Sequence, residues 1–122
     1  MAEYAVVQEN DLSRFQRILG NPVEGYNVLL LEQYSEAEIA SSGYVIHTLE
    51  ASLWCFLTTD TYKQAVLKAI NLGHDTDTTG CVTGGLAGLY YGAKTIPKNW
   101  IDTLVRKTDI LILAKRLGKR YG

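Results

Sequence analysis

The sequence predicts an all-α fold, organised as one compact helical domain over residues 1–122. From Leu49 onward, apolar residues recur every three or four positions, the spacing of one face of an α-helix. No repeat, linker or low-complexity segment divides the chain. A chain of 122 residues provides for a single modest hydrophobic core, so we expect one folding unit.

The first third of the chain carries the fewest structural signals. Asp11 is placed to cap a short helix over residues 12–19, which the Gly-Asn-Pro run at 20–22 ends. Residues 23–31 form a short apolar run, and such a run fits a buried strand-like or irregular segment as well as a helix. Their conformation therefore stays open.

Two helices are expected between Ser42 and Gly73. The run from Thr58 to Asp60 supplies a helix stop and a new cap, so the two helices should abut at Asp60. Gly73 stands where a C-terminal helix glycine belongs. The apolar faces of these helices consist of Leu49, Leu53, Phe56 and Leu57 in the first, and Tyr62, Val66, Ala69 and Ile70 in the second.

A third helix is expected to carry glycine at every fourth residue, namely Gly80, Gly84, Gly88 and Gly92. This spacing lines the glycines along one ridge. Each costs about 1 kcal/mol of helix stability relative to alanine, so the ridge predicts the close approach of another element. A last helical region opens at Ile96, with Pro97 in its first turn, and ends amphipathic and basic.

The charge balance excludes several partner classes. Lys and Arg number 12 and Asp and Glu 13, so no large net field favours nucleic acid or an anionic membrane surface. The longest uncharged run, residues 78–93, is shorter than the roughly 20 residues of a membrane-spanning helix. The N-terminus lacks the apolar stretch of a signal peptide, and Cys55 and Cys81 lie in apolar helical segments. We therefore expect a cytoplasmic protein with both thiols reduced and buried.

The segment "NLGHDTDTTGCVTGG", residues 71–85, contains the candidate metal-binding residues. Asp75, Asp77 and Thr78 place hard oxygen atoms at short spacing, as a magnesium or calcium site requires. The simplest alternative is helix capping, because acids at a helix N-terminus accept hydrogen bonds from unpaired amide groups.

Two specific alternatives fit this segment less well. An EF-hand loop starting at Asp75 requires a bidentate glutamate at its twelfth position, where Leu86 stands. A nucleotide P-loop requires a lysine that does not follow here, although amide groups at the helix start remain available to an anion.

Residues 41–104 resemble the ADP-ribosylglycohydrolase family, which includes the dinitrogenase reductase-activating glycohydrolases. The resemblance joins the Asp-Thr-Asp-Thr run at 75–78 to Gly43-Tyr44-Val45, Thr48-Leu49-Glu50 and "GLAGLYYG" at matching spacing. The preceding "YSEAEIA" is also similar to the family.

This resemblance implies an all-α fold and a two-magnesium site that engages ADP-ribose and supports its cleavage from a protein side chain. Manganese is the alternative ion. Asp75, Asp77 and Thr78 correspond to the metal ligands of the family's C-terminal motif, with Asp77 bridging. Gly43 and Tyr44 correspond to a loop that lines the nucleotide side of the cleft. Thr76 and Thr79 are interpreted as supporting or capping residues.

The chain departs from the family in one large respect. Members have about twice this length or more, and their N-terminal part carries a Thr-Asp-Asp ligand cluster and the acid proposed for catalysis. Residues 1–41 contain no such cluster. The resemblance therefore implies the C-terminal portion alone, which we expect to bind metal poorly and to be catalytically incomplete. No catalytic residue is assigned.

Two functions follow as hypotheses. The first is an ADP-ribosylglycohydrolase-type half-domain that acts on ADP-ribose or an ADP-ribosylated protein. The second is a non-catalytic module that binds ADP-ribose or another nucleotide, or serves in assembly. If the missing half normally packs on the glycine ridge, the chain would expose an apolar surface. Its partners would then be an N-terminal half on another chain, or further copies of itself.

The remaining polar and aromatic candidates are interpreted as structural. Magnesium prefers oxygen ligands, so His74 is assigned to packing or to support of the site. Glu50 is interpreted as a solvated or first-turn acid, with a role in orienting the metal loop as the alternative. His47 is expected to be partly buried in a helix, and the core aromatic residues are predicted to be Trp54, Tyr90, Tyr91 and Trp100.

Overall fold

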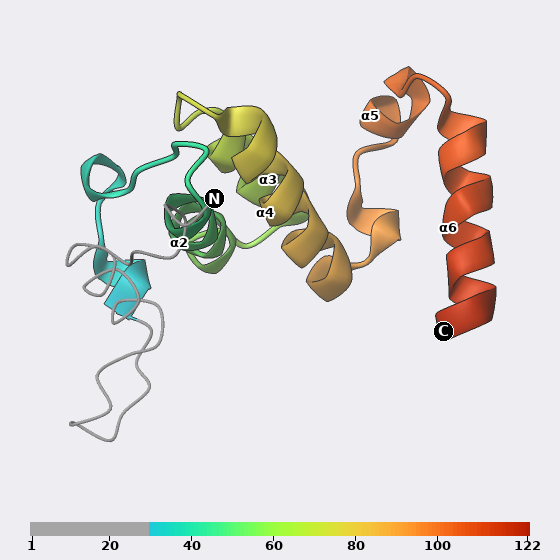
Figure 1. Ribbon diagram of the computed structural model, residues 1–122, viewed down its shortest axis with the longest axis horizontal. Helices are drawn as coiled ribbons and strands as arrows, with labels where there is room; N and C mark the ends of the chain where they lie inside the picture. Colours follow the sequence, from blue (N-terminus) through green and yellow to red (C-terminus); the bar gives the residue numbers. More distant parts are fainter. Residues whose placement is uncertain (1–29) are drawn as a thin grey trace, which may run out of the picture.

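The structure is a computed structural model that describes residues 30–122, and every regular element among these residues is helical (Figure 1). The predicted all-α fold is thereby confirmed. The predicted helix at 12–19 and most of the open segment 23–31 lie outside the described residues. The elements are η2 (Leu30–Gln33), η3 (Glu36–Glu38), α2 (Val45–Leu57), α3 (Tyr62–Ile70), α4 (Thr76–Tyr91), η4 (Ala93–Thr95), α5 (Lys98–Thr103) and α6 (Lys107–Tyr121).

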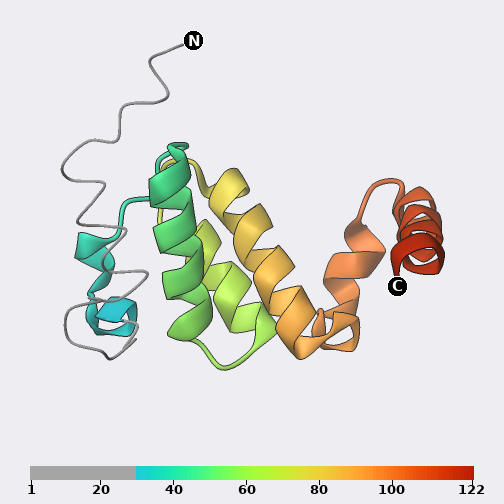
Figure 2. The same cartoon turned by 60° about the horizontal axis from the view of Figure 1, so that its bottom comes forward.

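Helices α2, α3 and α4 pack side by side and form the body of the fold (Figure 2). Trp54 is buried as predicted, and its indole Nε1 donates a 2.9 Å hydrogen bond to the carbonyl oxygen of Tyr34. This bond ties the segment before α2 to the core. The central cluster of buried side chains comprises Leu31, Trp54, Cys55 and Ala69.

The junction between α2 and α3 differs from the prediction by one residue. Thr61, and not Asp60, caps α3, because its Oγ1 accepts a 3.1 Å hydrogen bond from the backbone N–H of Gln64. Asp60 donates its own N–H to the Gln64 side chain at 3.1 Å. Beyond the other end of α3, Gly73 has a φ of +86°. This backbone conformation favours glycine, as the predicted helix end requires.

The glycine ridge of α4 faces α3. A Cβ built on Gly80 would lie 3.0 Å from Cγ2 of Ile70, and one on Gly84 would lie 3.4 Å from the Tyr62 hydroxyl. Gly88 faces the same tyrosine ring, so the predicted close approach is confirmed for three glycines. One part of the prediction was wrong, because Gly92 ends α4 with a φ of +89° instead of extending the ridge. The element that covers the ridge is α3 of the same chain and not a missing half.

Three side chains predicted to be buried or solvated differ in the structure. Cys81 is exposed, because the buried stripe of α4 runs through Thr79 and Thr83 and position 81 points away from it. Tyr90 is 73% exposed although it follows Thr83 and Ala87 at helical spacing, and its ring meets the Phe56 ring edge-on with centroids 5.4 Å apart. Tyr91 is half-buried and donates its hydroxyl to the carbonyl of Thr59. Glu50 is fully buried in α2 and is not a solvated acid.

The C-terminal region forms two helices instead of the single helical region expected. Pro97 is the N-cap of α5 and not a first-turn residue, and Arg106, with a φ of 57°, separates α5 from α6. Helix α6 is amphipathic and basic, as predicted, and stands apart from α2–α4 (Figures 1 and 2). No helix in the described part of the chain has the length and apolar character needed to cross a bilayer.

Candidate metal and nucleotide site

A sharp turn between α3 and α4 positions the candidate ligands. Gly73 and His74 both have positive φ values, 86° and 61°, which reverse the chain just before α4. The backbone N–H of Asp75 donates a 3.0 Å hydrogen bond to the carbonyl oxygen of Ser41. The buried Ser41 hydroxyl in turn donates to the carbonyl of Gly73. The turn is therefore tied at two points to the segment that precedes α2.

Asp75, Asp77 and Thr78 come together at the start of α4. The Thr78 hydroxyl donates to Oδ1 of Asp75 at 2.9 Å, and the Thr78 backbone N–H donates to Oδ1 of Asp77 at 3.0 Å. Asp75 occupies the N-cap position, but its side chain makes no capping hydrogen bond. A capping hydrogen bond therefore does not account for the Asp75 carboxylate.

The two carboxyl groups influence each other directly. The pKa of Asp75 is lowered, first by its interaction with the side chain of Asp77 and then by the hydrogen bonds from Thr78. Asp77 and Thr78 are exposed to solvent. The cluster is thus an accessible, negatively charged group of oxygen atoms.

The donor set fits one side of a magnesium site. Carboxylate and hydroxyl oxygens are the ligands that magnesium prefers, and water molecules usually complete its octahedron. Two carboxylates balance two of the four positive charges of a magnesium pair. Within residues 30–122, no cluster of three or more His, Cys, Asp or Glu residues could hold a metal ion. Asp75, Asp77 and Thr78 thus offer oxygen ligands for one side of such a site.

The loop before α2 lies against this cluster. A Cβ built on Gly43 would stand only 2.6 Å from Oδ2 of Asp75, so only glycine leaves this carboxylate where it is. The next residue, Tyr44, is the N-cap of α2 and is 42% exposed. Its ring meets the His47 ring edge-on, with centroids 5.3 Å apart. The structure thus brings Gly43 to the predicted ligands and keeps Tyr44 accessible.

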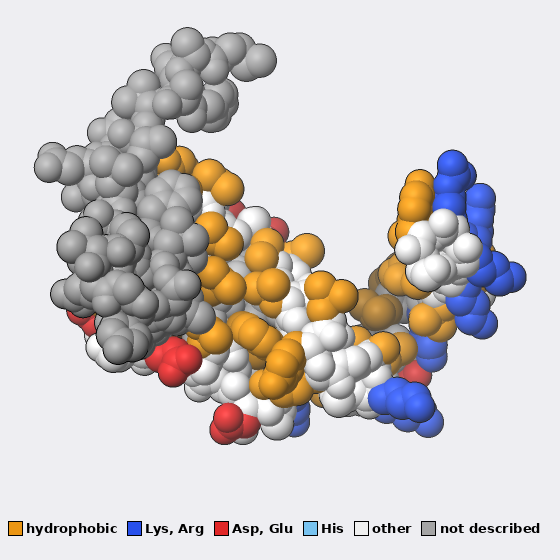
Figure 3. All heavy atoms as spheres, turned by 90° about the horizontal axis from the view of Figure 1, so that it is seen from below, with side chains coloured by type: hydrophobic (Ala, Val, Ile, Leu, Met, Phe, Trp, Pro, Cys, Tyr) orange, Lys and Arg blue, Asp and Glu red, His pale blue; other side chains and the backbone are white. Residues whose placement is uncertain are grey.

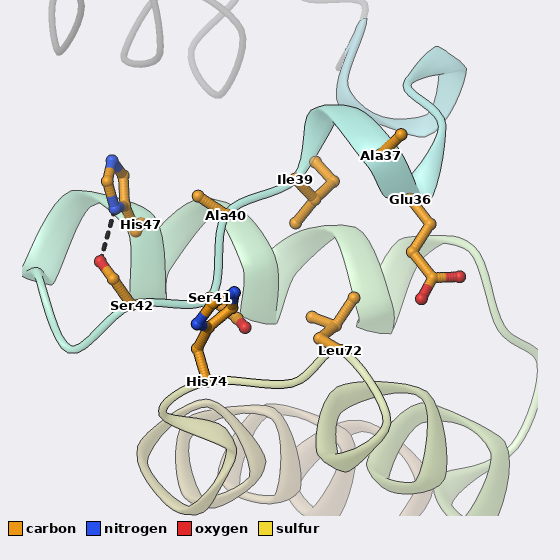
Figure 4. A pocket seen from close by; sticks show the side chains of 9 residues that line it. All are labelled: Glu36, Ala37, Ile39, Ala40, Ser41, Ser42, His47, Leu72 and His74. Atoms are coloured by element: carbon orange, nitrogen blue, oxygen red, sulfur yellow. Dashed lines mark hydrogen bonds between the residues drawn. The ribbon is translucent and has the colours of Figure 1, made fainter.

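A cavity of about 660 Å³ opens beside the turn (Figure 4). Ser42 and His47 line it and join in a 2.6 Å hydrogen bond between Oγ and Nδ1. His47 is half-buried in α2, as predicted, and His74 contributes to the opposite wall. Gly43 and Tyr44 are not among the lining residues. The sequence interpretation missed Ser41 and Ser42, although a serine pair directly before the loop glycine was the available signal.

Buried polar residues hold the start of α4 in place by hydrogen bonds. Thr79 is fully buried and donates its hydroxyl to the carbonyl of Asp75 at 3.2 Å. The Ser52 hydroxyl of α2 reaches the Thr79 carbonyl at 3.4 Å. Glu50 is buried on the same helix as Ser52. Helix α2 therefore fixes the end of α4 that presents the carboxylates.

Comparison with known proteins relates this geometry to a family. Residues 2–122 match the family model described as ADP-ribosylglycohydrolase. The chain is 50% identical over 80 residues to the ADP-ribosylarginine hydrolase Tri1 of Serratia proteamaculans (strain 568). That match covers 66% of this chain and 22% of Tri1.

Two further relatives carry different names. The ADP-ribosyl-[dinitrogen reductase] glycohydrolase of Rhodospirillum rubrum is 39% identical over 69 residues, which cover 57% of this chain and 24% of that protein. Crystallin J1A of Tripedalia cystophora is 22% identical over 129 residues, which cover 98% of this chain and 40% of the crystallin. The chain thus spans about a quarter of the length of the two hydrolases.

Proposed function

The chain belongs to the ADP-ribosylglycohydrolase family, and we propose that it supplies one side of a two-magnesium site for hydrolysis of ADP-ribose from a modified protein side chain. The ligands are Asp75, Asp77 and Thr78, with Asp77 as the bridging carboxylate. The observation that carries the proposal is the convergence of these three oxygen donors at the start of α4, with Gly43 against Asp75. Bound metal ions would polarise the hydroxyl groups of the ribose.

The residues of the chain bind and orient the substrate in this proposal. Gly43 lets the loop before α2 approach the carboxylates, and Tyr44 offers an accessible aromatic ring beside them. The cavity beside Ser42 and His47 provides polar hydrogen-bonding groups next to the metal ligands. ADP-ribose, which carries a diphosphate and two riboses, offers matching polar groups. The acceptor side chain to test first is arginine, because the relative at 50% identity is named for that linkage.

The ligand count argues that the chain is catalytically incomplete by itself. Two carboxylates leave the charge of a second divalent ion unbalanced, and glycoside hydrolysis requires a general acid or base near the scissile bond. Among residues 30–122, no third acidic side chain joins Asp75 and Asp77 in a group that could hold a metal ion. We therefore propose weak metal binding by the chain alone, with magnesium or manganese as the ion.

Calorimetry with ADP-ribose tests the proposed site. We expect weak binding that requires magnesium and falls at least about tenfold in Asp77→Ala, because one ligand to the ion is lost. Asp60→Ala is the matched control, since Asp60 is an exposed aspartate before α3 and outside the cluster. Binding that is equal with and without magnesium, and equal in both variants, would contradict the metal site. Titration with manganese in place of magnesium tests the identity of the ion.

A second candidate is a non-catalytic module that binds ADP-ribose or serves in assembly. It is favoured by the match to a relative named as a crystallin, which covers 98% of this chain, against 66% for Tri1. Metal-independent binding of ADP-ribose that tolerates Asp77→Ala would support this candidate over the first.

A further inference from the structure

The side of α4 that faces away from α2 and α3 carries no charge. From Thr78 to Tyr91 the helix contains no Asp, Glu, Lys or Arg, whereas the outer side of α3 exposes Lys63 and Gln64. A helix without a charged face is normally packed on all sides. The exposed residues opposite its buried stripe, here called the outer face of α4, are Thr78, Cys81, Val82, Gly85 and Leu89.

The outer face of α4 is exposed, but it carries the apolar side chains that are typical of a buried surface. Leu89 is 88% exposed and Val82 is 38% exposed, although both are aliphatic. Figure 3 shows hydrophobic side chains gathered over the middle of one side of the molecule, with Lys and Arg gathered near α6. Such exposed apolar areas mark interaction surfaces.

Gly85 gives independent evidence that something packs on this face. No described atom lies within 4 Å of a Cβ built on Gly85, whereas Gly80, Gly84 and Gly88 each face a side chain of α3. A glycine inside a helix costs about 1 kcal/mol relative to alanine. Contacts within the described residues compensate this cost at the other three positions and leave Gly85 unexplained. The absence of a side chain at Gly85 allows another helix to approach closely.

The outer face leads to the metal ligands. Thr78, Val82, Gly85 and Leu89 follow one another at helical spacing, so a polypeptide lying along this row ends beside Thr78 and Asp77. A partner in that place is positioned to add the oxygen ligands that the site lacks.

We propose that the outer face of α4 docks a helix from the part of an ADP-ribosylglycohydrolase that this chain does not represent. The size of that part supports the choice of occupant, because the matched segments make up only 22% and 24% of the two hydrolases. The inference rests on the proposed function for the identity of the partner. It concerns binding alone, so it is tested without metal or ADP-ribose and can fail while the metal site stands.

Co-expression tests the docking. The full chain is tagged and expressed with a Serratia Tri1 chain from which the matched 80 residues are deleted. We expect a complex with one copy of each chain. Gly85→Trp should weaken it at least tenfold, because the indole occupies the space of the docked helix. Lys63→Trp, on the charged outer side of α3, should leave it unchanged. Because the space around Gly85 is open, the isolated Gly85→Trp chain should keep its circular dichroism spectrum and unfolding midpoint.

The reactivity of Cys81, which lies on the outer face of α4, provides a second test of the docking. Its thiol is exposed, so a thiol reagent should modify it rapidly in the isolated chain at every protein concentration and at least tenfold more slowly in the complex. Absence of a complex would overturn the proposal, as would a complex that Gly85→Trp leaves intact. Protection of Cys81 that rises with the concentration of the isolated chain would assign the face to a second copy. Protection lost on deletion of residues 1–29 would assign it to the chain's own N-terminal segment. Either result would also overturn the proposal.

Discussion

Gly43 and Asp75 lie against each other although they are 32 residues apart in the sequence. A Cβ atom on Gly43 would stand only 2.6 Å from Oδ2 of Asp75. The contact is held by the hydrogen bonds that join Ser41 to Gly73 and to Asp75. It joins the two segments that the family resemblance had assigned separately to nucleotide binding and to metal binding. A glycine at position 43 is therefore explained by a neighbouring carboxylate.

Gly43→Ala should separate ligand binding from stability. The new methyl group displaces the end of the flexible Asp75 side chain, so the free energy of unfolding should change by less than about 0.5 kcal/mol. Because the carboxylate moves, we expect magnesium-dependent ADP-ribose binding to fall at least about tenfold. Calorimetry and chemical denaturation measure the two effects. A loss of stability without a loss of binding would refute this role of Gly43. Gly85→Ala is the control for glycine replacement, because no described atom crowds that position.

Thr61→Ala should destabilise the protein by about 1 kcal/mol, because α3 loses its N-cap hydrogen bond to the Gln64 amide. Asp60→Ala should cost less than about 0.5 kcal/mol, since the Asp60 side chain does not cap the helix. Urea denaturation of both variants measures the difference. Equal losses of unfolding free energy in the two variants would contradict the assignment of Thr61 as the N-cap of α3.

The cysteines should differ in reactivity and in their effect on stability at high pH. Burial raises the pKa of Cys55 from 9.0 to about 12, so its thiol should resist reagents that modify the exposed Cys81. In the unfolded chain Cys55 loses its proton near its ordinary pKa. Its contribution to stability is therefore complete below pH 9 and is lost between pH 9 and about 12. Cys55→Ala should remove this component of the alkaline loss, measured as the pH dependence of the free energy of unfolding. An identical alkaline slope in both proteins would contradict the assignment.

Deletion of α6, residues 107–122, should leave the stability of α2–α4 nearly unchanged. The helix makes no extended contact with these three helices, and its apolar residues are exposed. We expect the midpoint of thermal unfolding to shift by less than about 2 °C, which corresponds to a few tenths of a kcal/mol. A substantially larger decrease would mean that α6 packs on the bundle in solution.

The sequence predicted the positions of the helices well, but it did not predict which of their side chains are exposed to solvent. Helical spacing located α2, α3 and α4, and the glycines at positions 80, 84 and 88 predicted the close contact with α3. The exposure of Cys81 and Tyr90 was not predicted, because both lie in an uncharged helix that reads as buried on every side. The sequence pattern of a helix does not say which of its neighbours are present in the same chain.

The candidate site was predictable in part for a similar reason. Asp75, Asp77 and Thr78 are close in sequence, so their convergence follows from the start of one helix. The contact between Gly43 and Asp75 depends on the packing of two distant segments and on the Ser41 hydrogen bonds. Position and residue type alone do not determine such a contact.

The most direct test of the central claim is hydrolysis of an ADP-ribosylated arginine peptide by the isolated chain with magnesium. The chain is proposed to hold one side of the metal site and to lack the other ligands and the general base. We therefore predict no release of ADP-ribose above the rate without protein. Robust turnover by the chain alone, abolished by Asp77→Ala and retained in Asp60→Ala, would contradict the claim that it is one part of a larger active site.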